Sequence, residues 1–351
     1  MLAYPVWVVF RYPIGLEIVM EHYTQAQATG PGTLIVVLGM HRSGTSAITR
    51  ALVALGAELG DRLQEGIAGN NDRGFFEDKD IVAFNAKLLK DAGADWDTVS
   101  RVDLAGIDPT VLGELFQEAV ALLRGKCNGG IIGLKDPRIS RLMPFWQAVF
   151  DFIGMSVRYV IAVRNPISVA RSLMKRDGFG DEKSYLLWLG HVVPALLETR
   201  GRVRTLVDYD RLLDEPTEQL RRMASQLGVT VDDASAEAFG QEFVEEGLRH
   251  TRFSTQDLNA VRSAPSAVKR LFEELDEACR TGGPGAGFDA TVEAGRQFLA
   301  DIEPLLQYES RVEAQTVAKF NIALAALKAM LIERERRIAS LETEKRSPLN
   351  A

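Results

Sequence analysis

The sequence predicts an α/β protein in which a P-loop-like parallel sheet is flanked by helices and followed by a C-terminal helical or coiled-coil extension. Two observations predict the sheet: short apolar runs rich in β-branched residues alternate with helical patterns, and the first of these runs leads directly into a glycine-bearing loop and a helix. A third observation, a heptad pattern of apolar residues near the C-terminus, predicts the extension.

Length and composition are those of an ordinary globular protein. The 351 residues include 41 basic and 48 acidic side chains, a net charge of -7, and 46% are hydrophobic. This mild acidity does not favour a nucleic-acid binder, which usually shows a basic excess. The two cysteines, Cys127 and Cys279, have neither disulfide-scaffold nor zinc-site spacing and indicate a reducing compartment.

The N-terminal extension, residues 1–32, opens with an apolar stretch that Arg11 and Glu17 interrupt. Its apolar run is about half of the roughly 20 residues that a membrane helix needs. It also lacks a basic start and a clear cleavage pattern. We therefore expect no signal peptide, no transmembrane segment and a cytoplasmic location. Met20 begins a more typical soluble N-terminus, so residues 1–19 either belong to the protein or precede its true start.

Four apolar runs predict the strands of an α/β domain that spans residues 33–281. The strands are expected at Thr33–Leu38, Ile131–Leu134, Val157–Val163 and Val203–Val207. Helical patterns lie between and after them, at 45–57, 77–91, 109–125, 140–152, 166–176, 183–199 and 215–227. The Gly/Pro-rich segment 282–287 is typical of a linker, and residues 288–351 are expected to form a helical extension.

Within the extension, residues 317–341 follow a heptad register. Positions a are Val317, Leu324, Leu331 and Ile338, and positions d are Phe320, Leu327, Arg334 and Leu341. All of these except Arg334 are apolar, as expected for a coiled coil that would join two copies into a homodimer. An amphipathic helix packed on its own domain would show the same pattern, and both interpretations stay open.

The loop after the first strand has the features of an anion-binding site. Gly39 and Gly44 allow a tight turn and a close approach to the backbone. Backbone N–H groups at the start of the following helix point outward, and the helix dipole adds positive potential. Arg42 supplies a charged guanidinium, whose N–H donors can bind a phosphate. A strand, loop, arginine and hydroxyl residues in this order favour phosphate binding.

The spacing of Gly39 and Gly44 imitates the nucleotide-binding loop of ATPases and kinases. In those proteins, however, a lysine and then a serine or threonine follow the second glycine, whereas this chain has Thr45 and Ser46. The lysine grip on the β- and γ-phosphates is missing. A nucleotide kinase with a modified loop therefore remains as an alternative only.

The sequence HRSGTS, residues 41–46, resembles the 5′-phosphosulfate loop of sulfotransferases that use 3′-phosphoadenosine 5′-phosphosulfate (PAPS). A second motif agrees with this likeness: Arg164 ends a predicted strand and Ser172 follows eight residues later on the next helix. The family uses residues in this arrangement to hold the 3′-phosphate. The resemblance covers roughly residues 33–250. It implies donor-binding roles for Arg42, Ser43, Gly44, Thr45, Ser46, Arg164 and Ser172.

A third block, IIGLKDPRISRL, resembles the KDP segment of tyrosylprotein sulfotransferases and the LKDPR segment of bacterial relatives. By this likeness Lys135 reaches the oxygen that bridges sulfate and phosphate. By the same likeness Glu77, which follows an aromatic pair, is the catalytic base. Alternatively, Glu77 only begins a helix, where an acidic residue interacts favourably with the helix dipole. Glu65 and Asp136 are the reserve candidates for the base. Arg249 and His250 resemble residues near the active site of bacterial members.

The resemblance implies a sulfotransferase that moves a sulfuryl group from PAPS to a hydroxyl. The acceptor expected is a carbohydrate or glycoconjugate, and no metal is expected to be required. The four histidines form no HxxxH metal pair. Besides the modified kinase, one alternative from another class stays open. It is a non-catalytic nucleotide-binding scaffold whose coiled coil does the biological work.

Overall fold

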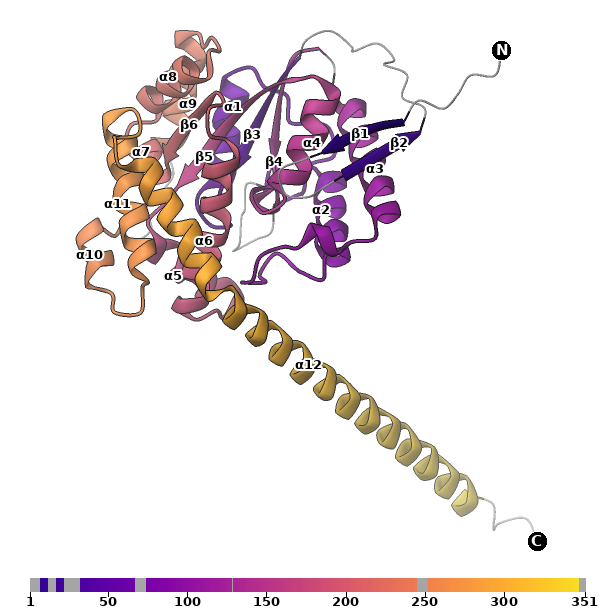
Figure 1. Ribbon diagram of the computed structural model, residues 1–351. Helices are drawn as coiled ribbons and strands as arrows, with labels where there is room; N and C mark the ends of the chain where they lie inside the picture. The colour runs from indigo at the N-terminus through magenta and orange to yellow at the C-terminus, as the bar shows by residue number, and fades with distance from the viewer. Residues whose placement is uncertain are drawn as a thin grey trace, which may run out of the picture. The chain divides into compact units, whose positions relative to one another are not determined.

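The structure is a computed structural model that describes residues 7–11, 17–21, 32–66, 74–127, 129–244 and 252–346. The chain divides into two compact units, residues 1–301 and 302–351. The first unit holds the four-stranded sheet (Figure 1). Arg249 and His250, which the sequence resemblance places near the active site, lie outside the described residues.

A four-stranded parallel sheet forms the centre of the first unit, in the order β4-β3-β5-β6. The strands are β3 Thr33–Leu38, β4 Ile131–Lys135, β5 Ser156–Val163 and β6 Arg204–Asp208. All four lie within one or two residues of the predicted runs. The sheet with helices on both faces confirms the predicted α/β fold class.

Alternation along β3 divides the core into two layers, because successive side chains of a strand point to opposite faces. Leu34, Val36 and Leu38 face one cluster, and Ile35 and Val37 face the other. The first layer holds α2 Lys79–Asp91, α3 Pro109–Lys126, α4 Met143–Ile153, α5 Pro166–Asp177, α6 Asp181–Glu198, α10 Thr255–Ala260 and α11 Ser266–Thr281. The second holds α1 Thr45–Ala54, α7 Tyr209–Asp214, α8 Pro216–Leu227 and α9 Asp233–Val244.

Helix ends follow local chemistry and explain where the predicted bounds shift. The helix expected at 77–91 begins at Lys79, because the Asp78 carboxylate accepts hydrogen bonds from the amides of Asp80 and Ile81 as an N-cap. The helix expected at 45–57 ends at Ala54, since Gly56 has a φ of 78°. In front of α4, residues Pro137–Ser140 form a short 3-10 turn.

The strand order places the candidate loop at a reversal in the sheet. β3 pairs with β4 on one side and β5 on the other, so the connections that leave these strands run in opposite directions. In open parallel sheets, ligands bind at such a switch point, outside the carboxyl ends of the strands. The loop after β3, the end of β4 and the end of β5 all lie at this edge.

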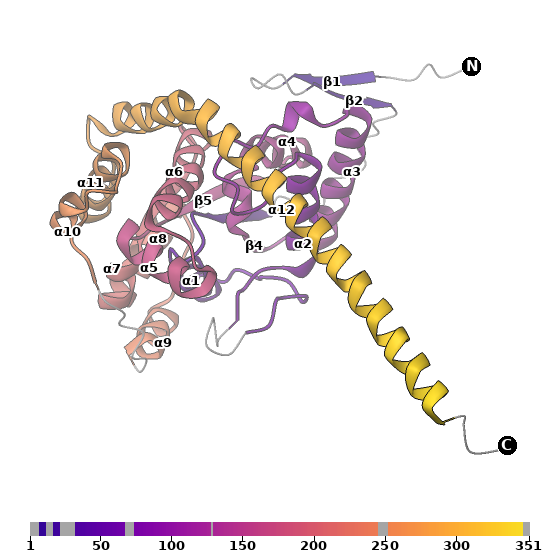
Figure 2. The ribbon, with the colours of Figure 1, turned by 90° about the horizontal axis from the view of Figure 1, so that it is seen from below.

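Residues of the N-terminal extension form an antiparallel hairpin that the sequence analysis did not predict. Its strands are β1 Trp7–Arg11 and β2 Glu17–Glu21. The hairpin lies beside α3 in both ribbon views (Figures 1 and 2). Arg11 and Glu17, which interrupt the apolar run, pair with each other at one end of the described register.

The last helix, α12, spans Phe288–Arg346. Its first turns belong to the first unit, where Phe288 and Val292 are buried in the core. The division between the units falls at residues 301 and 302, inside the helix rather than at the glycine-rich segment 282–287. Within the described part of the chain, α12 alone has a stretch apolar and long enough to cross a membrane by length and composition; none of that stretch is buried.

Candidate active site

The loop between β3 and α1 forms the floor of the candidate site. The Gly39 amide donates a hydrogen bond to the Ser140 hydroxyl at 2.8 Å, which ties the loop to the turn after β4. Gly44 is the N-cap of α1 and has a φ of 82°, and no side chain caps this helix. The amides of the first helical turn therefore present an anion-binding end.

Gly44 is required by its contact with Tyr209 as well as by its backbone angle. A Cβ at this position would lie 2.0 Å from Cδ2 of the Tyr209 ring. The same ring supports the Arg164 guanidinium, whose central carbon lies 4.5 Å from the ring centroid. Tyr209 thus packs between the loop and the arginine.

Arg42, Arg164 and Ser172 come together from three separate segments. Arg42 Nε donates to the Ser172 hydroxyl at 2.7 Å, and Arg164 Nη1 donates to the Arg42 carbonyl at 2.8 Å. Burial, followed by the charges of Arg176 and Arg164, lowers the pKa of Arg42. The structure therefore places the Arg42 side chain with the two residues predicted to hold the 3′-phosphate.

Polar atoms in and beside this cluster lack protein partners. The Ser43 hydroxyl and Arg164 Nε are buried and make no hydrogen bond to any residue that the structure describes. Buried polar groups are normally satisfied, so each such atom needs a specific explanation. An anion bound between the loop and Arg164 would supply acceptors for both groups. The residues present therefore fit a phosphate-bearing ligand.

On the β4 side of the loop, Lys135 and Glu77 form a buried ion pair. Lys135 Nζ lies 2.6 Å from Glu77 Oε1 and 3.3 Å from the Ser46 hydroxyl. Only 1% of the Lys135 side chain and 8% of the Glu77 side chain are exposed. Burial raises the pKa of Glu77, and the neighbouring Lys135 charge opposes this without reversing it. A carboxylate with a raised pKa beside a lysine is suited to proton transfer.

An unusual backbone conformation positions Glu77. Phe76 has a φ of 52°, in the left-handed region that bulky residues rarely adopt. The Gln64 amide donates to the Glu77 carbonyl at 2.7 Å and anchors the segment. Among the described non-glycine residues, only Phe76 and Arg42 have a positive φ. Both lie in the candidate site, where such strain commonly accompanies function.

The reserve carboxylates occupy different environments. Asp136 is fully buried; its oxygens accept from the Arg138 amide and guanidinium and from Asn85 Nδ2 at 2.9 Å. The Glu65 side chain is 92% exposed and lies 3.7 Å from Lys79. Of the three candidates, the structure brings Glu77 to Lys135. Asp78, its neighbour, is the residue that caps the helix.

The sequence analysis missed two arginines at the site. Arg176 lies four residues after Ser172 on α5, and residues at this spacing share a helix face. Arg138 follows Lys135 in the same block and lies 4.0 Å from Glu77 Oε2. The helical spacing of Arg176 and the motif position of Arg138 were signals that could have identified them.

His41, the first residue of the HRSGTS motif, is held in an aromatic cluster. Its ring lies edge-on to Trp96, with centroids 4.7 Å apart, and 5.9 Å from the ring of His191. Burial and the nearby His191 lower the pKa of His41 well below its usual value. The imidazole is therefore neutral at physiological pH and does not add positive charge to the loop.

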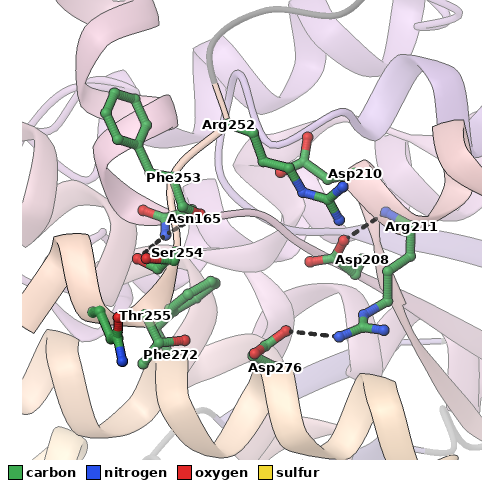
Figure 3. A pocket seen from close by; sticks show the side chains of 11 residues that line it. Asn165, Asp208, Asp210, Arg211, Arg252, Phe253, Ser254, Thr255, Phe272 and Asp276 are labelled. Atoms are coloured by element: carbon green, nitrogen blue, oxygen red, sulfur yellow. Dashed lines mark hydrogen bonds and ion pairs between the residues drawn. The ribbon is translucent and has the colours of Figure 1, made fainter.

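A cavity of about 330 Å³ lies beside this edge of the sheet, at the ends of β5 and β6 (Figure 3). Asn165 closes one side by donating its amide to the carbonyls of Phe253 and Ser254. Three aspartates line it together with Arg211 and Arg252: Asp208, Asp210 and Asp276. Burial raises the pKa of Asp208 to about 6. This acidic lining disfavours phosphate, in contrast with the loop after β3.

In the described part of the chain, no group of three or more histidine, cysteine, aspartate or glutamate side chains is arranged to hold a metal ion. No protein-family model matches the chain, and no curated protein matches its sequence.

Several solved sulfotransferase structures are similar to the chain. The sulfotransferase domain of a Synechococcus olefin synthase aligns at 15% identity, over 66% of this chain and 94% of that domain, with a TM-score of 0.35. A Mycobacterium avium sulfotransferase aligns at 16% identity, over 65% and 71% of the two chains, with a TM-score of 0.37. A mouse sulfotransferase complexed with PAP aligns at 12% identity, over 86% of this chain and 98% of that chain, with a TM-score of 0.33. Likeness at this level does not identify a reaction.

Proposed function

We propose that the protein is a PAPS-dependent sulfotransferase that acts on a hydroxyl acceptor. One observation carries this proposal: a single loop, residues 39–46, contacts two separate groups of residues that each contain basic side chains. Arg42 joins the loop to Arg164 and Ser172, whereas Ser46 contacts Lys135 of the buried Lys135–Glu77 pair. A donor with phosphate at one end and a transferable anionic group at the other matches this division.

The donor-binding residues divide between the two centres. The backbone amides of Ser43, Gly44, Thr45 and Ser46 would hold the 5′-phosphosulfate at the start of α1. Arg164 and Ser172, with Arg42 beside them, would hold the 3′-phosphate. Arg164 Nε has no partner among the described residues, which supports its assignment to this contact. Charge-assisted contacts of this kind are the strong hydrogen bonds of such sites.

Lys135 and Glu77 would act on the transfer step. Glu77 accepts the proton of the acceptor hydroxyl while the new bond between acceptor oxygen and sulfur forms. Lys135 stabilises the negative charge that develops on the phosphate oxygen as the bond between that oxygen and sulfur breaks, and the 3′,5′-bisphosphate (PAP) leaves. By analogy with phosphoryl transfer, positioning and electrostatics dominate the rate enhancement. No step assigned to these residues requires a metal.

The acceptor class that we propose is a hydroxyl of a carbohydrate or glycoconjugate. Its support is the sequence resemblance to the PAPS-dependent family, whose related members include tyrosylprotein and carbohydrate sulfotransferases. A cytoplasmic location is part of the same proposal.

The direct test is transfer of labelled sulfate from PAPS to pooled glycans, lipids and peptides in the presence of a chelator. We expect labelled product and PAP release by the parent protein and a large loss in a Lys135→Ala variant. A parallel reaction with ATP and magnesium tests the kinase alternative. Magnesium-dependent ATP turnover without sulfate transfer would contradict the proposal. Tight PAP binding with no transfer to any acceptor would favour the scaffold.

A further inference from the structure

The second half of α12 has an apolar face that no other described residue of its own unit covers. Between residues 317 and 341, the exposed fractions of the large apolar residues range from 38% for Leu324 to 71% for Ile322. Eight of these side chains lie on one side of the helix: Val317, Phe320, Leu324, Leu327, Met330, Leu331, Ile338 and Leu341. They correspond to positions a and d, with Met330 at an adjoining g position.

Except for Arg334 at position d, the polar residues within the same segment fall outside positions a and d. Lys319 falls at position c, and Asn321 and Lys328 fall at positions e. A bilayer-spanning helix would instead be apolar on all sides, since every side chain would meet lipid. A lysine near the bilayer centre would also be energetically costly. The pattern therefore favours a protein partner over a membrane.

The area of the face suits pairing of two helices. From their exposed fractions, these eight side chains present roughly 700 Å² per helix, or about 1,400 Å² for two, within the range of about 1,200–2,000 Å² buried in stable specific interfaces. The segment from 317 to 341 is about 37 Å long at about 1.5 Å per residue. Exposed apolar patches of this size mark interaction sites.

We infer that the occupant of this face is the same helix of a second copy, parallel and in register. Charge supports this orientation. In a parallel pair, Arg337 at position g faces position e of the next heptad, which is Glu342 of the second copy. Arg334 at position d faces Arg334 of the second copy, and position e of the same hole, Glu335 of the second copy, supplies the opposite charge. Both pairs have opposite charges and each occurs twice by symmetry.

A matched pair of double variants tests the inference in the full chain. Leu324→Glu with Leu331→Glu places charge on the a positions. Ile322→Glu with Ile332→Glu places the same charge on the opposite side, at f and b, where both side chains are also exposed. Leucine, isoleucine and glutamate differ little in intrinsic helix propensity, so the substitutions themselves do not disfavour the helix.

Sedimentation equilibrium at micromolar concentration is the readout. We expect a dimer for the parent chain and for the Ile322/Ile332 variant, and an about twofold lower mass for the Leu324/Leu331 variant. A monomeric parent chain would overturn the inference. So would equal loss of association in both variants, or flotation of the parent with phosphatidylcholine vesicles that both variants abolish.

A cysteine at one a or d position tests orientation. Leu341→Cys should give an oxidised covalent dimer, because identical d positions face each other in a parallel pair. The parent chain is the control, since Cys279 is buried and Cys127 is partly buried. A dimer in which Leu341→Cys forms no disulfide, while a mixture of Val317→Cys and Leu341→Cys chains does, would mean an antiparallel pair and would overturn the parallel assignment.

Discussion

The Lys135–Glu77 pair shows how burial sets the chemistry of a single carboxylate. The two groups are 2.6 Å apart, and the attraction by itself would lower the pKa of Glu77. Desolvation is the larger effect, so the pKa of Glu77 is raised. A more basic carboxylate is a better proton acceptor once it is ionised.

Glu77→Gln and Lys135→Ala should lower kcat far more than they change PAP affinity, because both residues are proposed to act in the transition state. A loss of about 10²–10⁴-fold is typical for a general base. Steady-state kinetics and calorimetric PAP titration separate the two effects. Glu65→Gln is the control, since that side chain is exposed and its nearest ion-pair partner is Lys79. Near-normal turnover by Glu77→Gln would show that another group is the base.

The pH profile gives an independent measure of the same residue. A base must be deprotonated to act, so kcat/KM should fall at low pH, with an apparent pKa above the ordinary glutamate value of 4.5. The Glu77→Gln variant should lose this acidic limb. An unchanged limb in the variant would assign it to a different group.

Arg164→Ala should weaken PAP binding by about 1.5–3 kcal/mol, since it removes charge-assisted hydrogen bonds to a phosphate. Isothermal titration calorimetry measures the loss. Arg158→Ala is a matched control, because Arg158 lies in β5, the strand that Arg164 follows, and donates instead to backbone carbonyls at residues 227 and 228. Equal affinities of the folded Arg164→Ala variant and the parent would contradict the 3′-phosphate assignment.

Asp208→Asn should stabilise the protein increasingly as the pH rises from about 4 to 7. Burial raises the pKa of Asp208 from 3.8 to about 6. The native state therefore holds its proton more tightly, and this contribution to stability is lost as the pH rises through the native pKa. The rise in the pKa of Asp208 corresponds to a difference in the free energy of unfolding on the order of 3 kcal/mol between low and neutral pH.

Urea unfolding of both proteins across this pH range measures the difference. Asparagine keeps the cap, in which the Asp208 carboxylate accepts from the Arg211 amide at 2.8 Å. A pH-independent difference between variant and parent would mean that the native pKa of Asp208 is not raised.

At the scale of elements, the loop from β3 to α1 depends on one close approach. The Tyr209 ring leaves no room for a Cβ at position 44, and the same ring contacts the Arg164 guanidinium. The conformation of the loop and the position of the arginine are therefore coupled through one aromatic ring.

Gly44→Ala should abolish PAP binding and strongly destabilise the first unit, because the new methyl group would overlap the Tyr209 ring. Gly56→Ala is a matched control. The φ of Gly56, 78°, is close to the 82° of Gly44, but a Cβ added at Gly56 would have no atom of the described residues within 4 Å beyond Gly56 and its two chain neighbours. The control should show only the left-handed backbone cost of about 1–2 kcal/mol. Thermal unfolding and PAP titration report both effects. Similar behaviour of the two variants would show that the Tyr209 contact is unimportant.

At the scale of the whole molecule, every described residue of the proposed site lies in the first unit, and the exposed apolar face lies in the second. Deletion of residues 312–351 should therefore leave PAP affinity within about twofold of the parent value, because no proposed contact is removed. Calorimetric titration of the truncated and full chains measures this. A large loss of affinity would show that the C-terminal segment contributes to donor binding.

Much of the first unit could be predicted from sequence because its signals are local. A buried parallel strand appears in the sequence as a short apolar run, and its neighbours in the chain mark where it ends. The glycines and hydroxyl residues of 39–46 likewise lie in one continuous segment. The hairpin β1–β2 was missed, since two five-residue strands close together in the chain resembled a single interrupted apolar stretch.

The sequence by itself determined the α/β alternation, the glycine-bearing loop between a strand and a helix, and the heptad pattern of α12. Only the tertiary structure decided which distant residues meet. It brought Glu77 to Lys135 across 58 positions and Arg42 to Ser172 across 130. It also left Glu65 exposed and tied Asp136 to Asn85 and Arg138. The physical reason is that periodicity specifies which face of an element is apolar, whereas the packing of elements at the sheet edge selects the side chains that share a site.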